Sequence, residues 1–255
     1  MKELLYILTV FFALHTEGVS AQSAAQSRFR ATAIAGVNLS QLDGDYQEGY
    51  RRKNACIGLS TAVIMRPDFD ISLETFYNPR GAQPLPEGTN QQTRYRTTID
   101  LKYADVVFLL NFHAFPHKSK LYYVQTLKMG MSYGRLLNSN VQMRYNNLSF
   151  TEYEQQIIKG LRKDDIAFVL GLAWQLSPQI GVMFRHTYSL RPIYELKNAI
   201  YVTSPAFIPV ANRDINYLRP YYISLHTFYH FLSPHKAVGV RRNKLGGGGD
   251  PLEEL

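Results

Sequence analysis

Charged and titratable side chains recur at alternate positions in segments whose other positions are mostly apolar. Those that we predict to share one enclosed face are Arg30, Glu74, Asp100, Lys102, Lys128, Arg185 and His226. Because an unpaired buried charge is costly, we expect the acids and bases among them to pair with one another. The alternative is a path for protons or ions. Glu74 and Asp100 could form an acid–base couple, but no nucleophile or metal ligand accompanies them in the sequence.

The histidines do not predict a metal centre. His226 and His230 share a strand face, but four residues of strand separate them by roughly 13 Å, too far to ligate one ion. His113 and His117 fall in a predicted short turn, where we expect them to be solvated. Asp43-Gly44-Asp45 lacks the further spaced oxygens of a calcium loop and is interpreted as a turn. We therefore predict no metal and no cofactor.

Catalysis on an outer wall would need a polar cluster there. His186 is predicted to face outward, whereas Ser189, three residues on, is predicted to face inward. A histidine at a membrane interface therefore explains the pattern better than a lipid-modifying enzyme does.

The segment that organises this interpretation is 221–231. Tyr221, Ile223 and Leu225 lie on one, apolar face of the predicted strand, while Ser224 and His226 lie on the other face. A strand of this length, apolar on one side and bounded by aromatic residues, suits a span of an outer membrane.

Seven other segments alternate in the same way: 29–39, 55–63, 71–77, 98–112, 121–133, 166–174 and 180–190. In the longest, Ile99, Leu101 and Tyr103 are predicted to face outward, and a bulge at Ala104-Asp105 then returns Val106 to the outer face. The sequence therefore predicts an all-β fold, an eight-stranded antiparallel up-and-down transmembrane β-barrel.

The connectors between these segments alternate in length. The long ones are 40–54, 78–97, 134–165 and 191–220, and the short ones are 64–70, 113–120 and 175–179. Short periplasmic turns and longer external loops are typical of outer-membrane barrels with both termini in the periplasm. A soluble β-sandwich, the competing fold, has no reason to keep this alternation.

Three regions follow from the ends of the chain. Residues 1–21 carry Lys2, an apolar core and a small-x-small cleavage site, and are predicted to be a signal peptide. The barrel is predicted over 22–232 and a flexible periplasmic tail over 233–255. The net charge of +8 indicates contact with anionic lipopolysaccharide or an envelope partner rather than with nucleic acid, since no nucleic-acid-binding signature is present.

The tail is basic, then glycine-rich, then acidic. Its candidate partner-binding residues are Arg241, Arg242, Lys244, Leu252 and Leu255. Glycines supply reach and the two leucines supply apolar anchors, as in a docking peptide. A solvated end without a partner, or a cloning remnant, is the alternative.

Three fragments resemble a known family. Residues 35–45 (AGVNLSQLDGD), 73–81 (LETFYNPRG) and 101–107 (LKYADVV) are similar to the first, third and fourth strands of the PorT-like outer-membrane β-barrel family of Bacteroidetes. The match departs at Ala104-Asp105-Val106, where that family usually has a proline. The resemblance implies an eight-stranded barrel without shared catalytic residues, and some members are associated with type IX secretion.

We therefore predict a non-catalytic outer-membrane anchor or accessory subunit of an envelope assembly. A narrow channel for small solutes is the second hypothesis, and a lipid-modifying enzyme is the third.

Overall fold

The structure is a computed structural model that describes residues 28–45, 49–84, 95–117, 122–145, 148–149, 151–195, 215 and 217–233. The predicted signal peptide lies outside the described residues, and so does the tail after Ser233. The five candidate partner-binding residues of the tail, Arg241, Arg242, Lys244, Leu252 and Leu255, therefore stay sequence predictions.

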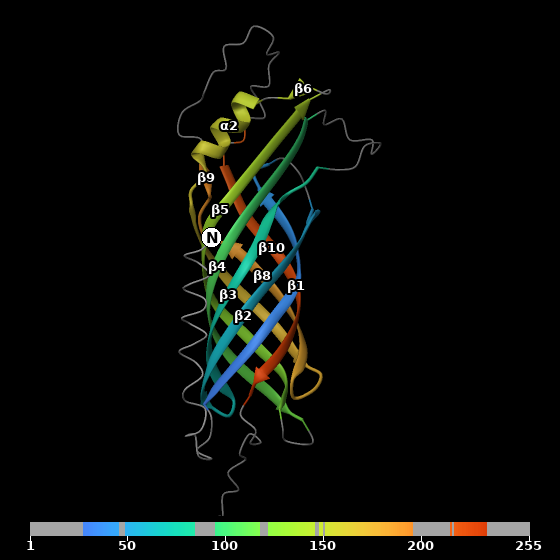
Figure 1. Cartoon of the computed structure of the whole chain (residues 1–255), viewed down its shortest axis with the longest axis vertical. Helices are drawn as coiled ribbons and strands as arrows, with labels where there is room; N and C mark the ends of the chain where they lie inside the picture. Colours follow the sequence, from blue (N-terminus) through green and yellow to red (C-terminus); the bar gives the residue numbers. More distant parts are fainter. Residues whose placement is uncertain are drawn as a thin grey trace, which may run out of the picture.

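Eight long antiparallel strands close into a barrel (Figure 1). They are β1 (Phe29–Asp43), β2 (Arg52–Arg66), β3 (Phe69–Ala82), β4 (Tyr95–Pro116), β5 (Tyr123–Tyr145), β7 (Asp164–Gln175), β8 (Ile180–Ser189) and β10 (Tyr217–Leu232). Each pairs with the next along the chain, and β1 pairs with β10 to complete the ring. Two short strands, β6 (Leu148–Ser149) and β9 (Tyr194–Glu195), add to β5 and β10. The predicted all-β, eight-stranded, up-and-down barrel is confirmed.

The two ends of the barrel differ. At the turn end, consecutive strands are joined through 67–68, 117–122 and 176–179. At the loop end, where β1, β3, β5 and β8 finish, the connections are longer, and the helix α2 (Thr151–Gly160) lies over the barrel (Figure 1). Several strands also run farther toward the loop end than the sequence predicted. No helix in the described part of the chain is long and apolar enough to cross a bilayer.

Large apolar side chains cover the outside of the barrel below the loop end. Ile57 and Leu59 on β2 are 62% and 57% exposed, and Leu225 on β10 is 57% exposed. Their neighbours Cys56 and Ser60 are buried. Apolar surface of this extent is unfavourable in contact with water and favourable in contact with the hydrocarbon of a membrane. We call this surface the outer band.

The predicted phase of β4 is wrong at the loop end. Ile99 and Leu101 are fully buried and pair with Ala82 and Arg80, so they face the interior. Alternation in β4 continues without a break, and the bulge predicted there lies instead on β5, where Leu137 is the extra residue. The reason is the surroundings: beyond the outer band the exterior is aqueous, so apolar residues turn inward.

The inward apolar residues of the loop end pack into a core. Its buried members are Leu42, Ala82, Ile99, Leu101, Tyr103, Val141, Ile157, Leu161, Ile193, Tyr194, Ile215 and Leu218. They come from strands, from α2 and from the neighbouring connections, so α2 covers the end of the barrel with its apolar face. We call this group the loop-end core.

Candidate functional site in the barrel lumen

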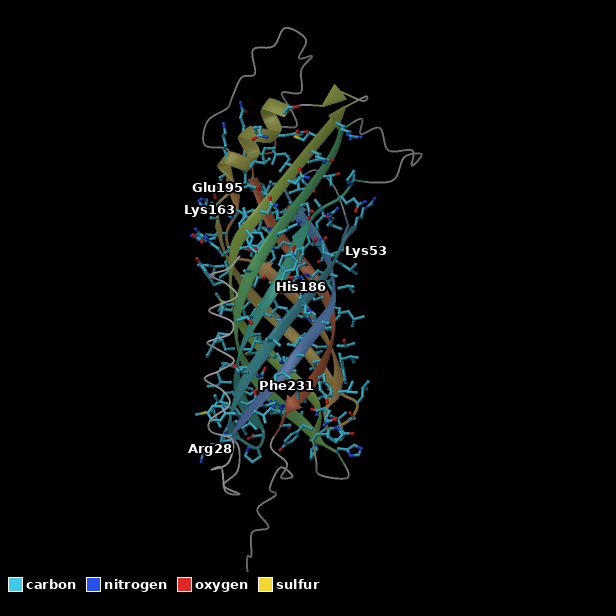
Figure 2. The ribbon with its side chains drawn as sticks, in the orientation of Figure 1. Arg28, Lys53, Lys163, His186, Glu195 and Phe231 are labelled. Carbon is cyan, nitrogen blue, oxygen red and sulfur yellow. The ribbon has the colours of Figure 1, made fainter. Side chains whose placement is uncertain are left out.

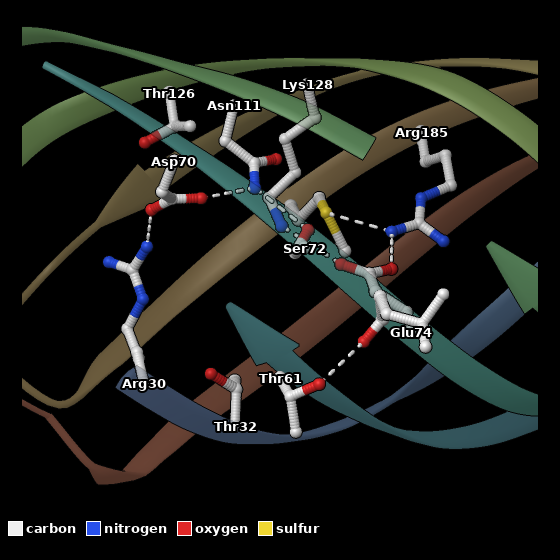
Figure 3. Close-up of polar contacts among 12 residues, drawn as sticks. Arg30, Thr32, Thr61, Asp70, Ser72, Glu74, Asn111, Thr126, Lys128 and Arg185 are labelled. Carbon is white, nitrogen blue, oxygen red and sulfur yellow. Dashed lines mark hydrogen bonds and ion pairs between the residues drawn. The ribbon is translucent and has the colours of Figure 1, made fainter. Parts of the chain in front are cut away.

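The middle of the lumen is built around one carboxylate. Glu74 on β3 is fully buried, and its Oε1 accepts a hydrogen bond of 3.1 Å from Lys128 Nζ on β5. Its other oxygen accepts a hydrogen bond from Arg185 on β8. Strands from opposite parts of the sheet therefore meet at Glu74, as Figure 3 shows. A buried carboxylate with two cations is a paired, charge-assisted cross-link.

The turn-end side of the lumen is organised around Asp70. This carboxylate pairs with Arg30, accepts a 2.5 Å hydrogen bond from Asn111 Nδ2, and contacts His113 Nε2 at 2.7 Å (Figure 3 draws the first two). His113 was predicted to be solvated in a turn, which is wrong. The strand β4 extends through Pro116, so His113 is carried into the lumen and its Nδ1 lies 2.8 Å from Thr126 Oγ1.

A small cavity with both polar and apolar lining lies beside this cluster. It has a volume of about 40 Å³ and is lined by Arg30, Ser72, Asn111, His113, Lys128 and His230, among others. That volume has room for a few water molecules and excludes a solute of ordinary metabolite size. The cavity is a small recess in a barrel that side chains otherwise fill.

A third cluster lies toward the loop end. Arg80 contacts Asp105 at 3.1 Å and Asp165 at 3.4 Å, and its guanidinium carbon sits 3.7 Å from the centre of the Tyr103 ring. All of these side chains are buried. Arg80, Asp105 and Asp165 were not among the lumen residues predicted from the sequence. Arg80 lies an even number of residues from Glu74 on one strand, and that parity was the available signal.

Five of the seven predicted lumen residues face inward, and two do not. Arg30, Glu74, Lys128, Arg185 and His226 lie in the lumen; the His226 ring packs 5.5 Å from that of Phe76. Asp100 pairs across the sheet with Gly81 and Lys102 with Pro79, on the face opposite to the buried Leu101. Asp100 instead forms an ion pair of 3.1 Å with Arg52. Glu74 and Asp100 therefore form no acid–base couple.

The charges joined by ion pairs inside the barrel balance. Their members are Arg30, Arg80, Lys128 and Arg185 on the basic side and Asp70, Glu74, Asp105 and Asp165 on the acidic side. With neutral histidines, the network carries no net formal charge. Such pairing stabilises a packed lumen, as expected for an eight-stranded barrel.

The residues considered for catalysis and metal binding lie apart from one another. No group of three or more His, Cys, Asp or Glu side chains that could hold a metal occurs among the described residues. Ser189 is buried and donates a 2.8 Å hydrogen bond to Asp165 Oδ2 inside the barrel. His186 pairs with Ile223 and Leu170 on the outward face, so these two candidates lie on opposite sides of the wall.

Residues 20–195 match the family model described as outer membrane protein β-barrel domain, which is more than half of the sequence. The chain belongs to this family. Members are barrels of the outer membrane, and the exposed apolar band of this protein fits that location.

Two solved structures are similar to this chain at low identity. Ail, the attachment invasion locus protein of Yersinia pestis, is 11% identical with a TM-score of 0.42, covering 80% of this chain and all of that chain. Neisserial surface protein A is 10% identical with a TM-score of 0.41, covering 81% and 99%. A search of curated protein sequences finds no match.

Proposed function

We propose that this outer-membrane barrel is non-catalytic and acts as an anchor or accessory subunit of an envelope assembly. The observation that carries the proposal is the closure of its lumen. Ion-paired side chains fill the middle, and the loop-end core lies across the end. A barrel without an open path has its outer and terminal surfaces left for function.

The loop end supplies one such surface. The strands β4 and β5 continue beyond the outer band, and α2 with β9 packs on the loop-end core (Figure 1). This part is held by its own apolar core, so it can present a fixed surface to another protein. The loops within 134–165 and 191–220 are our candidate external contacts.

The finer assignment rests on the sequence. The resemblance to PorT-like barrels supports a place in a type IX-like protein secretion assembly of a Bacteroidetes-type envelope. Short turns at one end and long loops at the other support an orientation with both termini in the periplasm. The tail would then reach a periplasmic partner through Arg241, Arg242, Lys244, Leu252 and Leu255.

Affinity purification from native membranes tests this proposal. We expect the full chain to co-purify with envelope proteins, and a chain ending at Ser233 to lose those that bind the tail. A full-length chain in which Leu252 and Leu255 are changed to Ser keeps the length and the charge of the tail, and it should lose the same proteins if the two leucines are the anchors. Recovery of the barrel alone from all three preparations contradicts the anchor proposal.

A narrow channel is the second candidate, supported by the charged side chains of the lumen and the small recess near Asp70. Planar-bilayer recordings decide between the two. The anchor proposal predicts no unitary conductance for the wild-type protein. Steady conductance that changes with Lys128→Gln or Arg185→Gln favours the channel. Mass spectrometry of lipid A with and without the gene tests the third candidate, a lipid-modifying enzyme, for which we expect no difference.

A further inference from the structure

The small cavity beside Asp70 lies at the turn-end mouth of the lumen. Four of its lining residues come from the turn-end limits of β1, β4, β7 and β10, namely Arg30, His113, Gln175 and His230. The Gln175 side chain reaches the turn itself, where its Nε2 donates a 3.0 Å hydrogen bond to the carbonyl oxygen of Pro178. The cavity therefore lies between the turn end and the ionic middle of the barrel.

The charged part of the cavity lining is basic. Arg30 on β1 and Lys128 on β5, which stand on opposite walls of the barrel, both contribute to it, whereas no carboxylate of the described residues does. The acidic partners are covered: the side chains of Asp70 and Glu74 are 0% exposed, while those of Arg30 and Lys128 are 18% and 16% exposed. Figure 3 shows both basic side chains extending into the lumen. The cavity therefore meets the basic member of each ion pair and not the acidic one.

Positive charge exceeds negative charge around the cavity. The two carboxylates of the middle and turn-end clusters pair with three cations when His113 is counted as neutral. The compensating carboxylate belongs to the third cluster, in which Asp105 and Asp165 share Arg80. Arg80 follows Glu74 by six residues on β3, so roughly 20 Å of strand separate the two. The ion-paired network is neutral as a whole, but its turn-end half carries one surplus positive charge.

Several donors at the cavity retain hydrogens for a ligand. Arg30 and Lys128 each donate one hydrogen bond to a carboxylate, so both keep further N–H groups without a partner among the described residues. The Ser72 hydroxyl accepts a 2.8 Å hydrogen bond from Asn111 Nδ2, which leaves its own proton available. Asn111 Oδ1 is a buried acceptor without a partner in the same part of the chain, and a water molecule beside an ion can donate to it. The volume of about 40 Å³ holds one small ion with one such water molecule.

We propose that this cavity binds one small monovalent anion, of about the size of chloride, between the Arg30 guanidinium and the Lys128 ammonium. The surplus charge selects an anion and sets its valence at one. The bound ion neutralises that surplus and accepts hydrogen bonds from donors that are costly to leave unpaired away from bulk water. The site goes beyond the anchor proposal, because it requires neither a partner protein nor the tail.

The test measures chloride binding to the purified full-length protein in detergent from the broadening of the chloride NMR signal, with gluconate replacing chloride at constant ionic strength. We expect bromide to compete for the site and sulfate, which is larger and divalent, not to compete. Lys128→Gln leaves Glu74 paired with Arg185, and it should weaken chloride binding about tenfold through the loss of one charge-assisted hydrogen bond. The matched control is Lys163→Gln, which removes the same charge from the outer surface near the loop end (Figure 2) and should bind chloride as the wild type does.

A variant that fills the cavity and keeps every charge gives an independent test. Ala173 is buried and lines the cavity, so Ala173→Val should also abolish chloride binding. Heat-modifiable electrophoretic mobility verifies that each variant is folded. If Lys128→Gln does not fold, Ala173→Val and the position of the ion in the wild type decide.

The position of the ion is measured by anomalous scattering from crystals of the wild type grown with bromide. We expect one bromide between Arg30 and Lys128. Equal affinity of Lys128→Gln and Lys163→Gln overturns the proposal, and so does undiminished binding in Ala173→Val or a cavity without bromide. Because the experiments contain no envelope protein, a negative result leaves the anchor proposal standing, and failure to recover envelope partners leaves the anion site standing.

Discussion

The middle of the barrel and its loop end are built from the same strands, but apolar residues face outward in the middle and inward at the loop end. In the middle, β4 presents Phe108 outward and contributes Asp105 to the interior. At the loop end, the same strand turns Leu101 inward and places Lys102 on the outer face. The alternation never breaks, because only the environment of the outer face changes from lipid to water. Odd and even positions of a strand lie on opposite faces, and the medium outside the barrel determines which face is apolar.

The largest effect should come from breaking the ionic middle. Glu74→Ala leaves Lys128 and Arg185 buried together without their carboxylate, so we expect a loss of about 3–5 kcal/mol in the free energy of unfolding. The measurement is urea unfolding in lipid vesicles followed by electrophoretic mobility. Asp100→Ala is the control, with an expected loss within about 1 kcal/mol because its pair with Arg52 is partly exposed. Similar losses in both variants would contradict the two-region description.

The loop-end core should respond as the interior of a soluble protein does. Leu101→Ala is expected to lose about 2–5 kcal/mol, since it removes packed atoms and leaves a cavity. Leu59→Ala on the outer band should lose less, because lipid fills the space that the side chain leaves. The same unfolding assay measures both. Equal losses would indicate that the loop-end core is loosely packed.

The outer face should show where lipid ends. Phe108→Arg, near the middle of the outer band, is expected to lose about 2–4 kcal/mol. Thr98→Arg, on the outward face of the same strand at the loop end, should be almost neutral. A series of single arginines along β4 then maps the boundary. If Thr98→Arg is as costly as Phe108→Arg, hydrocarbon extends farther than the structure indicates.

The smallest effect is expected at Asp164, which lies beyond the outer band. Its hydrogen bonds with Arg135, the larger contribution, and with Tyr133 hold the pKa of Asp164 below its usual range. The folded pKa is lower than the unfolded one, so the stabilisation is present above the unfolded value and is lost as the pH falls through the folded value. The wild type should therefore lose slightly more stability than Asp164→Asn between about pH 5 and pH 3. A steeper loss in the variant would contradict this assignment.

Much of the fold could be predicted from the sequence because lipid imposes a strict constraint on the outer band. The outward faces predicted for 55–63, 166–174 and 221–231 are confirmed. The phase of 98–103 could not be predicted, since the sequence does not mark where lipid gives way to water. A bulge was therefore assigned to β4 to keep Ile99 outward, whereas the bulge lies at Leu137.

The same error hid part of the lumen network. Assigning Ala104-Asp105 to a bulge removed Asp105 from the inner face, and with it the partner of Arg80. Glu74, Lys128 and Arg185 were found because each follows an exposed apolar residue (Leu73, Leu127 and Phe184) in a segment whose predicted phase is correct. The pairing of particular acids with particular bases depends on the register between distant strands, which periodicity within one strand does not contain.

The balance between acids and bases inside the barrel has an electrical consequence. A transmembrane voltage exerts a net force on a group of charges in proportion to their sum, and the eight ion-paired side chains described inside the barrel sum to zero. We therefore expect a change in membrane potential to exert no net force on this network as a whole.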